Sequence, residues 1–128
     1  MSKSDDIVSG RAPEPVGAFP HAKKVGNLLF LSGIGPRSRG TTAIPQGIEA
    51  QTLAVFANVR TVLEDAGSSW EHIVDVQVFL TDMKNDFPTF NRLYAEHFTD
   101  NQPTRTTVEV GSLPTPISVE LKVIATVD

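Results

Sequence analysis

The chain has 128 residues, enough for one domain with a sizeable core and too few for two. Hydrophobic residues make up 40% of it and charged residues 20%, close to the average for globular proteins. The net charge of −4 argues against a nucleic-acid partner, because such proteins present a basic surface. The lack of cysteine excludes disulfides, thiolate nucleophiles and zinc–thiolate sites.

The first residues read as a polar extension of mixed charge, without the apolar core of a signal peptide. No stretch approaches the roughly 18 consecutive apolar residues that a membrane span requires. We therefore expect a flexible tail over residues 1–12, one domain over residues 13–128, no membrane partner and a cytoplasmic location.

Two strands and a loop are predicted at the start of the domain. Gly26-Asn27 is a turn dipeptide that accepts positive φ, and residues 28–31 are continuously apolar. Residues 33–47 are rich in glycine and proline, which predicts a loop.

A helix and a strand follow. Apolar residues recur at helical spacing over residues 48–66, and Gly67 is expected to end this helix as a left-handed cap. Residues 73–80 alternate, which predicts a strand with Val74, Val76, Val78 and Leu80 on one face.

A second helix and two closing strands complete the chain. Asp86 is the expected N-cap, with Pro88 in the first turn. The apolar face of this helix comprises Phe87, Phe90, Leu93, Tyr94 and Phe98. Arg105 opens the next strand, and the last strand places Val119, Leu121, Val123, Ala125 and Val127 on one face.

These elements predict an α+β fold with a single mixed sheet. Each helix has one apolar face, so both helices can cover one side of the sheet. The other side must then meet water or another subunit. The second face of the last strand is semi-polar, as expected for a subunit interface with clefts, and we expect an oligomer.

Two charged residues on the closing strands are candidates for chemistry. Arg105 and Glu120 interrupt the alternation, and an Arg and a Glu on rigid strands favour a site that binds a carboxylate and handles water. The three histidines show no metal-ligand spacing, which predicts a site without metal or cofactor.

Several segments together resemble the reactive intermediate deaminase family (RidA, also called YjgF). They lie at residues 17–22, 25–33, 48–52, 58–67, 78–83, 90–98 and 103–125. The resemblance implies a chorismate-mutase-like fold, homotrimers with sites between subunits, and cofactor-independent hydrolysis of enamines and imines to 2-keto acids and ammonia.

The resemblance also implies roles for individual residues. Arg105 matches the arginine that binds the substrate carboxylate, and Glu120 matches the glutamate that positions or activates water. The substrate-binding positions that match or replace family residues are Ser32, Gly33 and Asn91, together with Phe19 in place of a Tyr and His21 in place of a Gln.

One segment departs from relatives that act on small imino acids. The run Ser32-Gly-Ile-Gly-Pro-Arg37 is similar to the 2-aminomuconate deaminase branch, whose substrate is an enamine with two carboxylates. This similarity implies conversion of 2-aminomuconate to 4-oxalocrotonate in aromatic-compound catabolism. Arg37 is then a candidate for binding the second carboxylate.

Other interpretations remain open at this point. The enzyme can instead be a general 2-iminobutanoate/2-iminopropanoate deaminase, or the chain a non-catalytic ligand-binding or chaperone-like module. Arg105 can be structural, paired with Glu109 or Glu120, and Arg37 can be a solvated loop residue. A ribonuclease, an activity also ascribed to some relatives, fits poorly with the negative charge.

Overall fold

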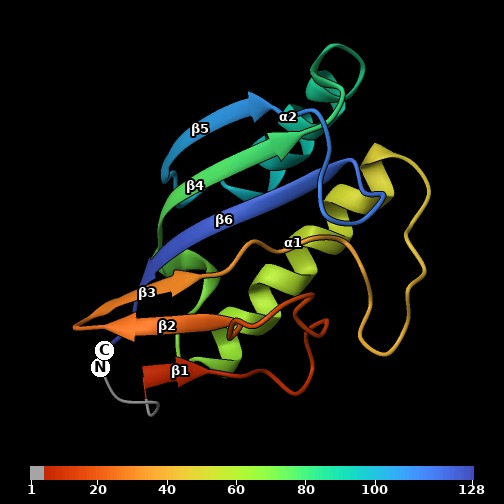
Figure 1. Ribbon diagram of the computed structural model, residues 1–128. Helices are drawn as coiled ribbons and strands as arrows, with labels where there is room; N and C mark the ends of the chain where they lie inside the picture. The colour runs from red at the N-terminus through yellow and green to blue at the C-terminus, as the bar shows by residue number, and fades with distance from the viewer. Residues whose placement is uncertain (1–4) are drawn as a thin grey trace.

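A single mixed sheet forms the framework of the molecule (Figure 1). The computed structural model describes residues 5–128. The strands are β1 (Asp6–Ile7), β2 (Ala22–Val25), β3 (Leu28–Leu31), β4 (Ile73–Leu80), β5 (Thr104–Glu109) and β6 (Val119–Thr126). Their order across the sheet is β1-β2-β3-β6-β4-β5, and only β4 and β5 run parallel to each other.

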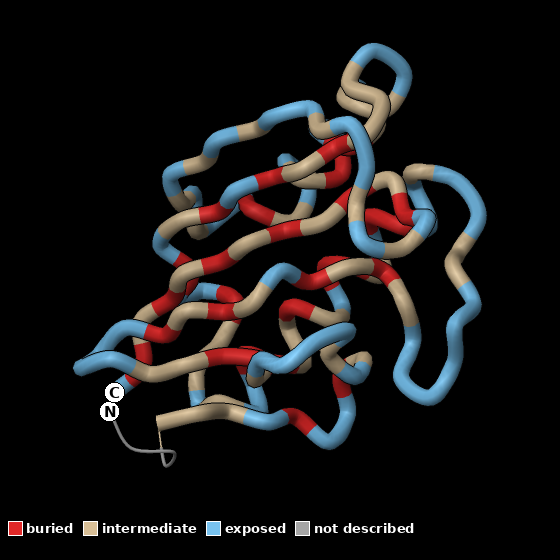
Figure 2. Tube along the Cα trace, in the orientation of Figure 1, coloured by how far each residue is buried: buried red, intermediate tan, exposed pale blue. Residues whose placement is uncertain are grey.

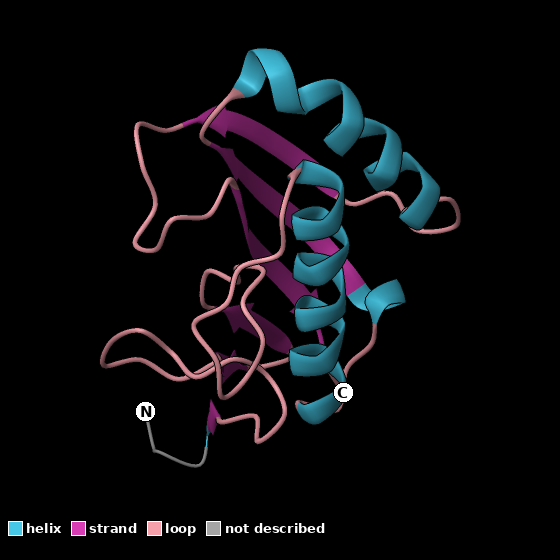
Figure 3. Cartoon of the chain, turned by 90° about the vertical axis from the view of Figure 1, so that its right-hand side faces the viewer, coloured by secondary structure: helices cyan, strands magenta, loops and turns pink. Residues whose placement is uncertain are grey.

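Both long helices lie on one side of this sheet, as Figure 3 shows. They are α1 (Ile48–Asp65) and α2 (Met83–His97), and a short 3-10 helix, η2 (Trp70–His72), precedes β4. The predicted α+β class, with one mixed sheet and two helices on one face, is therefore confirmed. Neither helix within residues 5–128 is long and apolar enough to cross a membrane.

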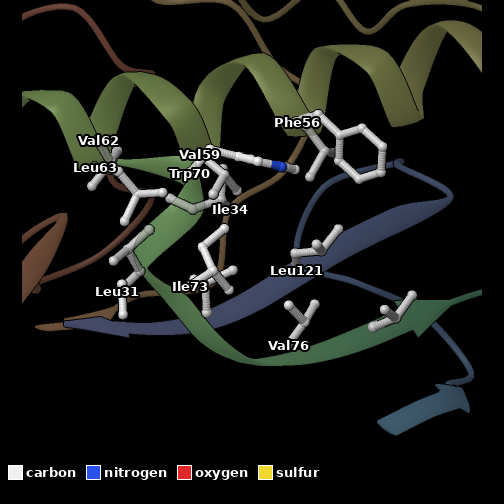
Figure 4. Close-up of a cluster of buried hydrophobic side chains, with 14 of the residues drawn as sticks. Leu31, Ile34, Phe56, Val59, Val62, Leu63, Trp70, Ile73, Val76 and Leu121 are labelled. Atoms are coloured by element: carbon white, nitrogen blue, oxygen red, sulfur yellow. The ribbon is translucent and has the colours of Figure 1, made fainter. Parts of the chain in front are cut away.

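The core lies between the helices and the sheet (Figure 4). Helix α1 contributes Val55, Phe56, Val59, Val62 and Leu63, all buried. Fully burying an aliphatic or aromatic side chain of this size stabilises the fold by about 1.5–3 kcal/mol. The predicted apolar stripe of α1 is thus the surface that attaches this helix to the sheet.

The two central strands alternate between buried and partly exposed residues (Figure 2). In β6 the predicted inward face is confirmed, because Val119, Leu121, Val123 and Ala125 are fully buried. In β4 the prediction is wrong for Val74, which is exposed. A β-bulge between Ile73 and Asp75 shifts the register there and turns Ile73 inward instead.

The ends of the helices test two further predictions. Gly67 has φ of +82° and lies just past α1, and the N–H of Ser68 donates to the carbonyl of Leu63 at 2.8 Å, which confirms the left-handed stop. Asp86 as the cap of α2 is wrong. Asp82 caps this helix by accepting from the N–H of Asn85 at 3.3 Å, so Asp86 already lies in the first turn.

Residues 5–12 do not behave as the predicted flexible tail. Ile7 pairs with Ala22, which makes β1 the edge strand of the sheet. Ser9 and Ala12 are buried, and Arg11 forms an ion pair with Asp65 at 2.6 Å. The tail prediction is therefore wrong for residues 5–12, because their contacts come from distant parts of the chain. Residues 1–4 lie outside the described residues.

Candidate functional site

A pocket with a volume of about 70 Å³ lies where β3 ends and β6 begins. Its lining comes from four separate stretches of the chain: residues 13–16, Phe19 and His21, residues 32–37, and a final stretch of Pro114, Thr115, Ile117 and Glu120. A water molecule needs roughly 10–15 Å³ by this kind of measure, so the pocket has room for several waters or a small organic molecule.

Glu120 lies directly against the backbone of Gly33. Residues on either side fix this contact: Ile34 and Leu121 exchange two backbone hydrogen bonds of 2.8 and 3.0 Å. A Cβ atom on Gly33 would lie only 2.5 Å from Oε2 of Glu120. Glycine at position 33 is therefore what lets the carboxyl group occupy this position.

The environment of Glu120 suits proton transfer. The side chain is half-buried, and burial raises the pKa of its carboxyl group above the ordinary value. A carboxyl group whose pKa moves toward neutrality can both donate and accept a proton at physiological pH. Glu120 combines this property with direct access to the pocket.

Arg37 also lines the pocket, but its charge is already paired. Its Nη1 lies 3.3 Å from Oε1 of Glu14 and donates to the carbonyl of Thr41 at 3.1 Å, while Nη2 donates to the carbonyl of Glu14. The side chain is only 16% exposed, so the interpretation of Arg37 as a solvated loop residue is wrong.

His21 holds the N-terminal wall of the pocket in place. Its Nδ1 accepts from the N–H of Ser9 at 2.9 Å, and Nε2 lies 2.8 Å from the carbonyl of Pro13. These partners require the neutral tautomer with the proton on Nε2. Both ring nitrogens are thereby occupied, so the geometry gives His21 a structural role at the edge of the pocket.

Ser32 and Phe19 complete the residues that the sequence placed here. The hydroxyl of Ser32 donates to the carbonyl of Pro20 at 2.7 Å, which ties the segment after β3 to the segment before β2. Phe19 is 41% exposed and gives the pocket an apolar wall. The pocket therefore brings together six of the expected site residues: Phe19, His21, Ser32, Gly33, Arg37 and Glu120.

One residue that shapes the pocket was not identified from the sequence. Nδ2 of Asn58, on α1, donates to the carbonyls of Gly35 and Arg37, each at 2.9 Å. These bonds fix the loop that carries Arg37. The available signal was Asn58 itself, because asparagine inside a helix is unfavourable unless its side chain has a partner.

Arg105 and Asn91 lie outside this pocket, near or on α2. The guanidinium carbon of Arg105 is 4.6 Å from the ring centre of Tyr94 and 5.8 Å from that of Phe87. Such distances allow cation–π contacts. Asn91 is exposed on α2.

The strand register explains why Arg105 and Glu120 are apart. Arg105 aligns with Val76, which faces the helices, whereas Glu120 aligns with Phe79 on the opposite face of the sheet. Among residues 5–128 no carboxylate forms an ion pair with Arg105, so the alternatives of pairing with Glu109 or Glu120 are wrong. Glu109 instead accepts from the N–H of Met83 at 2.9 Å.

The described chain, residues 5–128, also offers no cluster of three or more His, Asp or Glu side chains that could hold a metal ion. The geometry thus presents a pocket with a half-buried carboxyl group, an ion-paired arginine at its wall, and a separate arginine on the helix-covered face.

Comparison with known proteins identifies the family to which the chain belongs. A family model described as Endoribonuclease L-PSP matches residues 9–127. A RutC family protein of Pyrococcus abyssi is 40% identical over 120 residues, covering 93% of this chain and 94% of its own. The chain belongs to this family, which is also known as the RidA/YjgF family.

Solved structures agree with this assignment. The crystal structure of yeast Mmf1 has a TM-score of 0.91 and 36% identity, covering 96% of this chain and 98% of that one. The structure of E. coli TdcF with bound serine has a TM-score of 0.89 and 32% identity, with the same coverage of the two chains.

Proposed function

We propose that this protein hydrolyses enamines and imines of small 2-amino acids to 2-keto acids and ammonia. The observation that carries the proposal is the half-buried carboxyl group of Glu120, whose pKa is raised and which lies in a pocket of suitable size. Membership of the family supports a deaminase role, and TdcF, a structural relative, has serine bound.

Glu120 can serve each proton transfer in this reaction. Its protonated form delivers a proton to the β-carbon of the enamine, which gives the imine. Water then adds to the imine carbon while the Glu120 carboxylate takes up a proton from it. Transfer of that proton to the nitrogen lets the C–N bond break while the hydroxyl proton passes to the Glu120 carboxylate, which releases ammonia, leaves the 2-keto acid and restores the protonated carboxyl group.

We propose Arg105 as the group that binds the substrate carboxylate. Its planar guanidinium suits a bidentate contact, and it has no ion-pair partner among residues 5–128. Because Arg105 and Glu120 face opposite sides of one sheet, they can act on one substrate only if they come from different subunits.

This requirement supports the homotrimer that the family resemblance implies. The side of the sheet away from the helices carries exposed apolar residues on three strands, namely Val25, Leu28 and Val108. Covering such a surface with another subunit removes it from water. We propose that this face forms the subunit interface, and that Arg105 reaches the Glu120 pocket of the next subunit from β5, which lies at the edge of the sheet.

A subunit-mixing experiment tests this arrangement. Arg105→Ala and Glu120→Ala should each abolish ammonia release from 2-iminobutanoate. Co-expression in equal amounts should restore activity to about a quarter of the sites. In random assembly each site has an even chance of receiving an intact Arg105 and an independent even chance of receiving an intact Glu120. Mixed subunits with no recovered activity would refute a shared site, and light scattering measures the number of subunits directly.

A second candidate is 2-aminomuconate deaminase. The observation in its favour is that Arg37, a possible partner for a second carboxylate, lines the same pocket as Glu120. Its pairing with Glu14 weighs against that role. Side-by-side turnover of 2-aminomuconate and 2-iminobutanoate distinguishes the two activities, and turnover of neither would leave a non-catalytic ligand-binding module.

A further inference from the structure

Glu14 is bound so that it cancels the charge of Arg37 at the pocket. Oε1 of Glu14 lies 3.3 Å from Nη1 of Arg37, and the backbone carbonyl of Glu14 accepts from Nη2. The N–H of Gly40 donates to the same Oε1 at 3.1 Å. Glu14 is therefore fixed by loop backbone as well as by the arginine.

The charge on Glu14 persists over the whole physiological range. The N–H of Gly40, then the residue's own backbone N–H, and the Arg37 guanidinium lower the pKa of Glu14 to about 2. Arg37 in turn is placed without help from the Glu14 carboxylate, because two backbone carbonyls accept from it and Asn58 fixes its loop.

The contacts that hold Arg37 in place are therefore different from the contact that neutralises its charge. If the carboxylate of Glu14 were absent, Arg37 would remain at the wall of the pocket with an uncompensated positive charge. With Glu14 present, a second carboxylate on a ligand must compete with an anion that is already bound. A single carboxylate held elsewhere, by Arg105 of a neighbouring subunit, meets no such competition.

We propose that Glu14 is a specificity-determining residue that neutralises Arg37 and so restricts the pocket to substrates with one carboxylate. This inference rests on the proposed function for the identity of the substrate. It also assigns a reason for the acidic residue in the N-terminal wall, which the catalytic proposal does not use.

Matched pairs of unreactive acids measure this selectivity without catalysis. Crotonate and fumarate share a four-carbon skeleton, and sorbate and trans,trans-muconate share a six-carbon one. Within each pair the second acid differs by carrying one more carboxylate. Isothermal titration calorimetry on the assembled wild-type protein and on Glu14→Gln gives the ratio of dicarboxylate to monocarboxylate affinity for both chain lengths.

We expect Glu14→Gln to raise that ratio about tenfold for at least one chain length, which corresponds to about 1.4 kcal/mol. Arg37→Gln should lower it below the wild-type value, because Glu14 then repels the second carboxylate. In the Arg37→Gln background, the added Glu14→Gln change should relieve this repulsion but should not raise the ratio above the wild-type value.

Glu64→Gln is the matched control. Glu64 is also an exposed glutamate in an ion pair, with Arg11, and lies outside the pocket lining, so this variant changes the net charge equally. An unchanged ratio in folded Glu14→Gln, or an equal rise in Glu64→Gln, would overturn the proposal. Thermal melting confirms that each variant is folded.

Ammonia release from 2-iminobutanoate distinguishes a failure of the proposed deaminase function from a failure of the Glu14 proposal. If wild-type protein releases no ammonia from 2-iminobutanoate but the affinity ratio shifts as expected, the pocket selects monocarboxylates without acting on imines. If turnover is normal and the ratio does not shift, the function stands and the role of Glu14 is refuted.

Discussion

Replacing Gly33 with alanine tests whether the position of Glu120 controls activity. The added Cβ would lie 2.5 Å from Oε2 and 3.0 Å from Cδ of Glu120, whereas ordinary van der Waals contact begins at 3.4 Å. The carboxyl group must therefore withdraw by about 0.9 Å. Its side chain borders the pocket, so there is space into which it can move.

The size of the effect follows from this displacement. Misplacing a catalytic group by about 1 Å can cost on the order of 100-fold in rate, or about 2.7 kcal/mol of transition-state stabilisation. We expect kcat/KM of Gly33→Ala for 2-iminobutanoate to fall by about that factor. The free energy of unfolding should change by less than about 1 kcal/mol, because reduced freedom of the unfolded chain opposes the local strain.

The assay is initial-rate ammonia release, with urea denaturation of the same samples. Gly111→Ala is the matched control, because a Cβ at that position would meet no atom within 4 Å. The control should keep wild-type kcat/KM. A folded Gly33→Ala protein that also keeps wild-type kcat/KM would show that close packing of Glu120 on Gly33 is not needed for the reaction.

Three further predictions concern stability. Glu120→Gln should make the protein more stable than wild type at about pH 8 and not at about pH 4, as measured by urea denaturation. Burial raises the folded-state pKa of Glu120, so the wild type loses stability as pH rises through that pKa. Equal stability differences at both pH values would contradict this prediction. Ser9→Ala should cost about 1–3 kcal/mol and speed proteolysis of the N-terminal segment, because its hydroxyl donates to Asp65 at 2.6 Å and accepts from Ala12 at 3.0 Å. Gly67→Ala should cost about 1–2 kcal/mol in thermal melts, since its φ of +82° strains any residue with a Cβ.

Local patterns predicted most of the fold. The alternation in β6 and the apolar stripe of α1 each follow from a period that a few adjacent residues reveal. The stop at Gly67 depends on one residue and its immediate neighbours. Errors arose where distant contacts decide: the bulge near Val74 belongs to the pairing of β4 with β6, and residues 5–12 are ordered by β2 and by Asp65.

The candidate site was likewise predictable from local motifs and not where contacts between distant segments decide. Family motifs identified Glu120, Gly33 and Arg37 as site residues, and the fold places all three in one pocket. No local pattern showed that Arg37 is neutralised by Glu14, because that ion pair joins two loops 23 residues apart in the chain.

The sequence by itself determined the class of fold, the faces of the main helix and of β6, and the family, because periodicity and motif spacing are local properties of the chain. Only the tertiary structure decided that Arg105 and Glu120 face opposite sides of the sheet. The reason is physical: which way a strand residue points depends on its register with neighbouring strands, and β4, β5 and β6 are joined by hydrogen bonds between segments far apart in the chain.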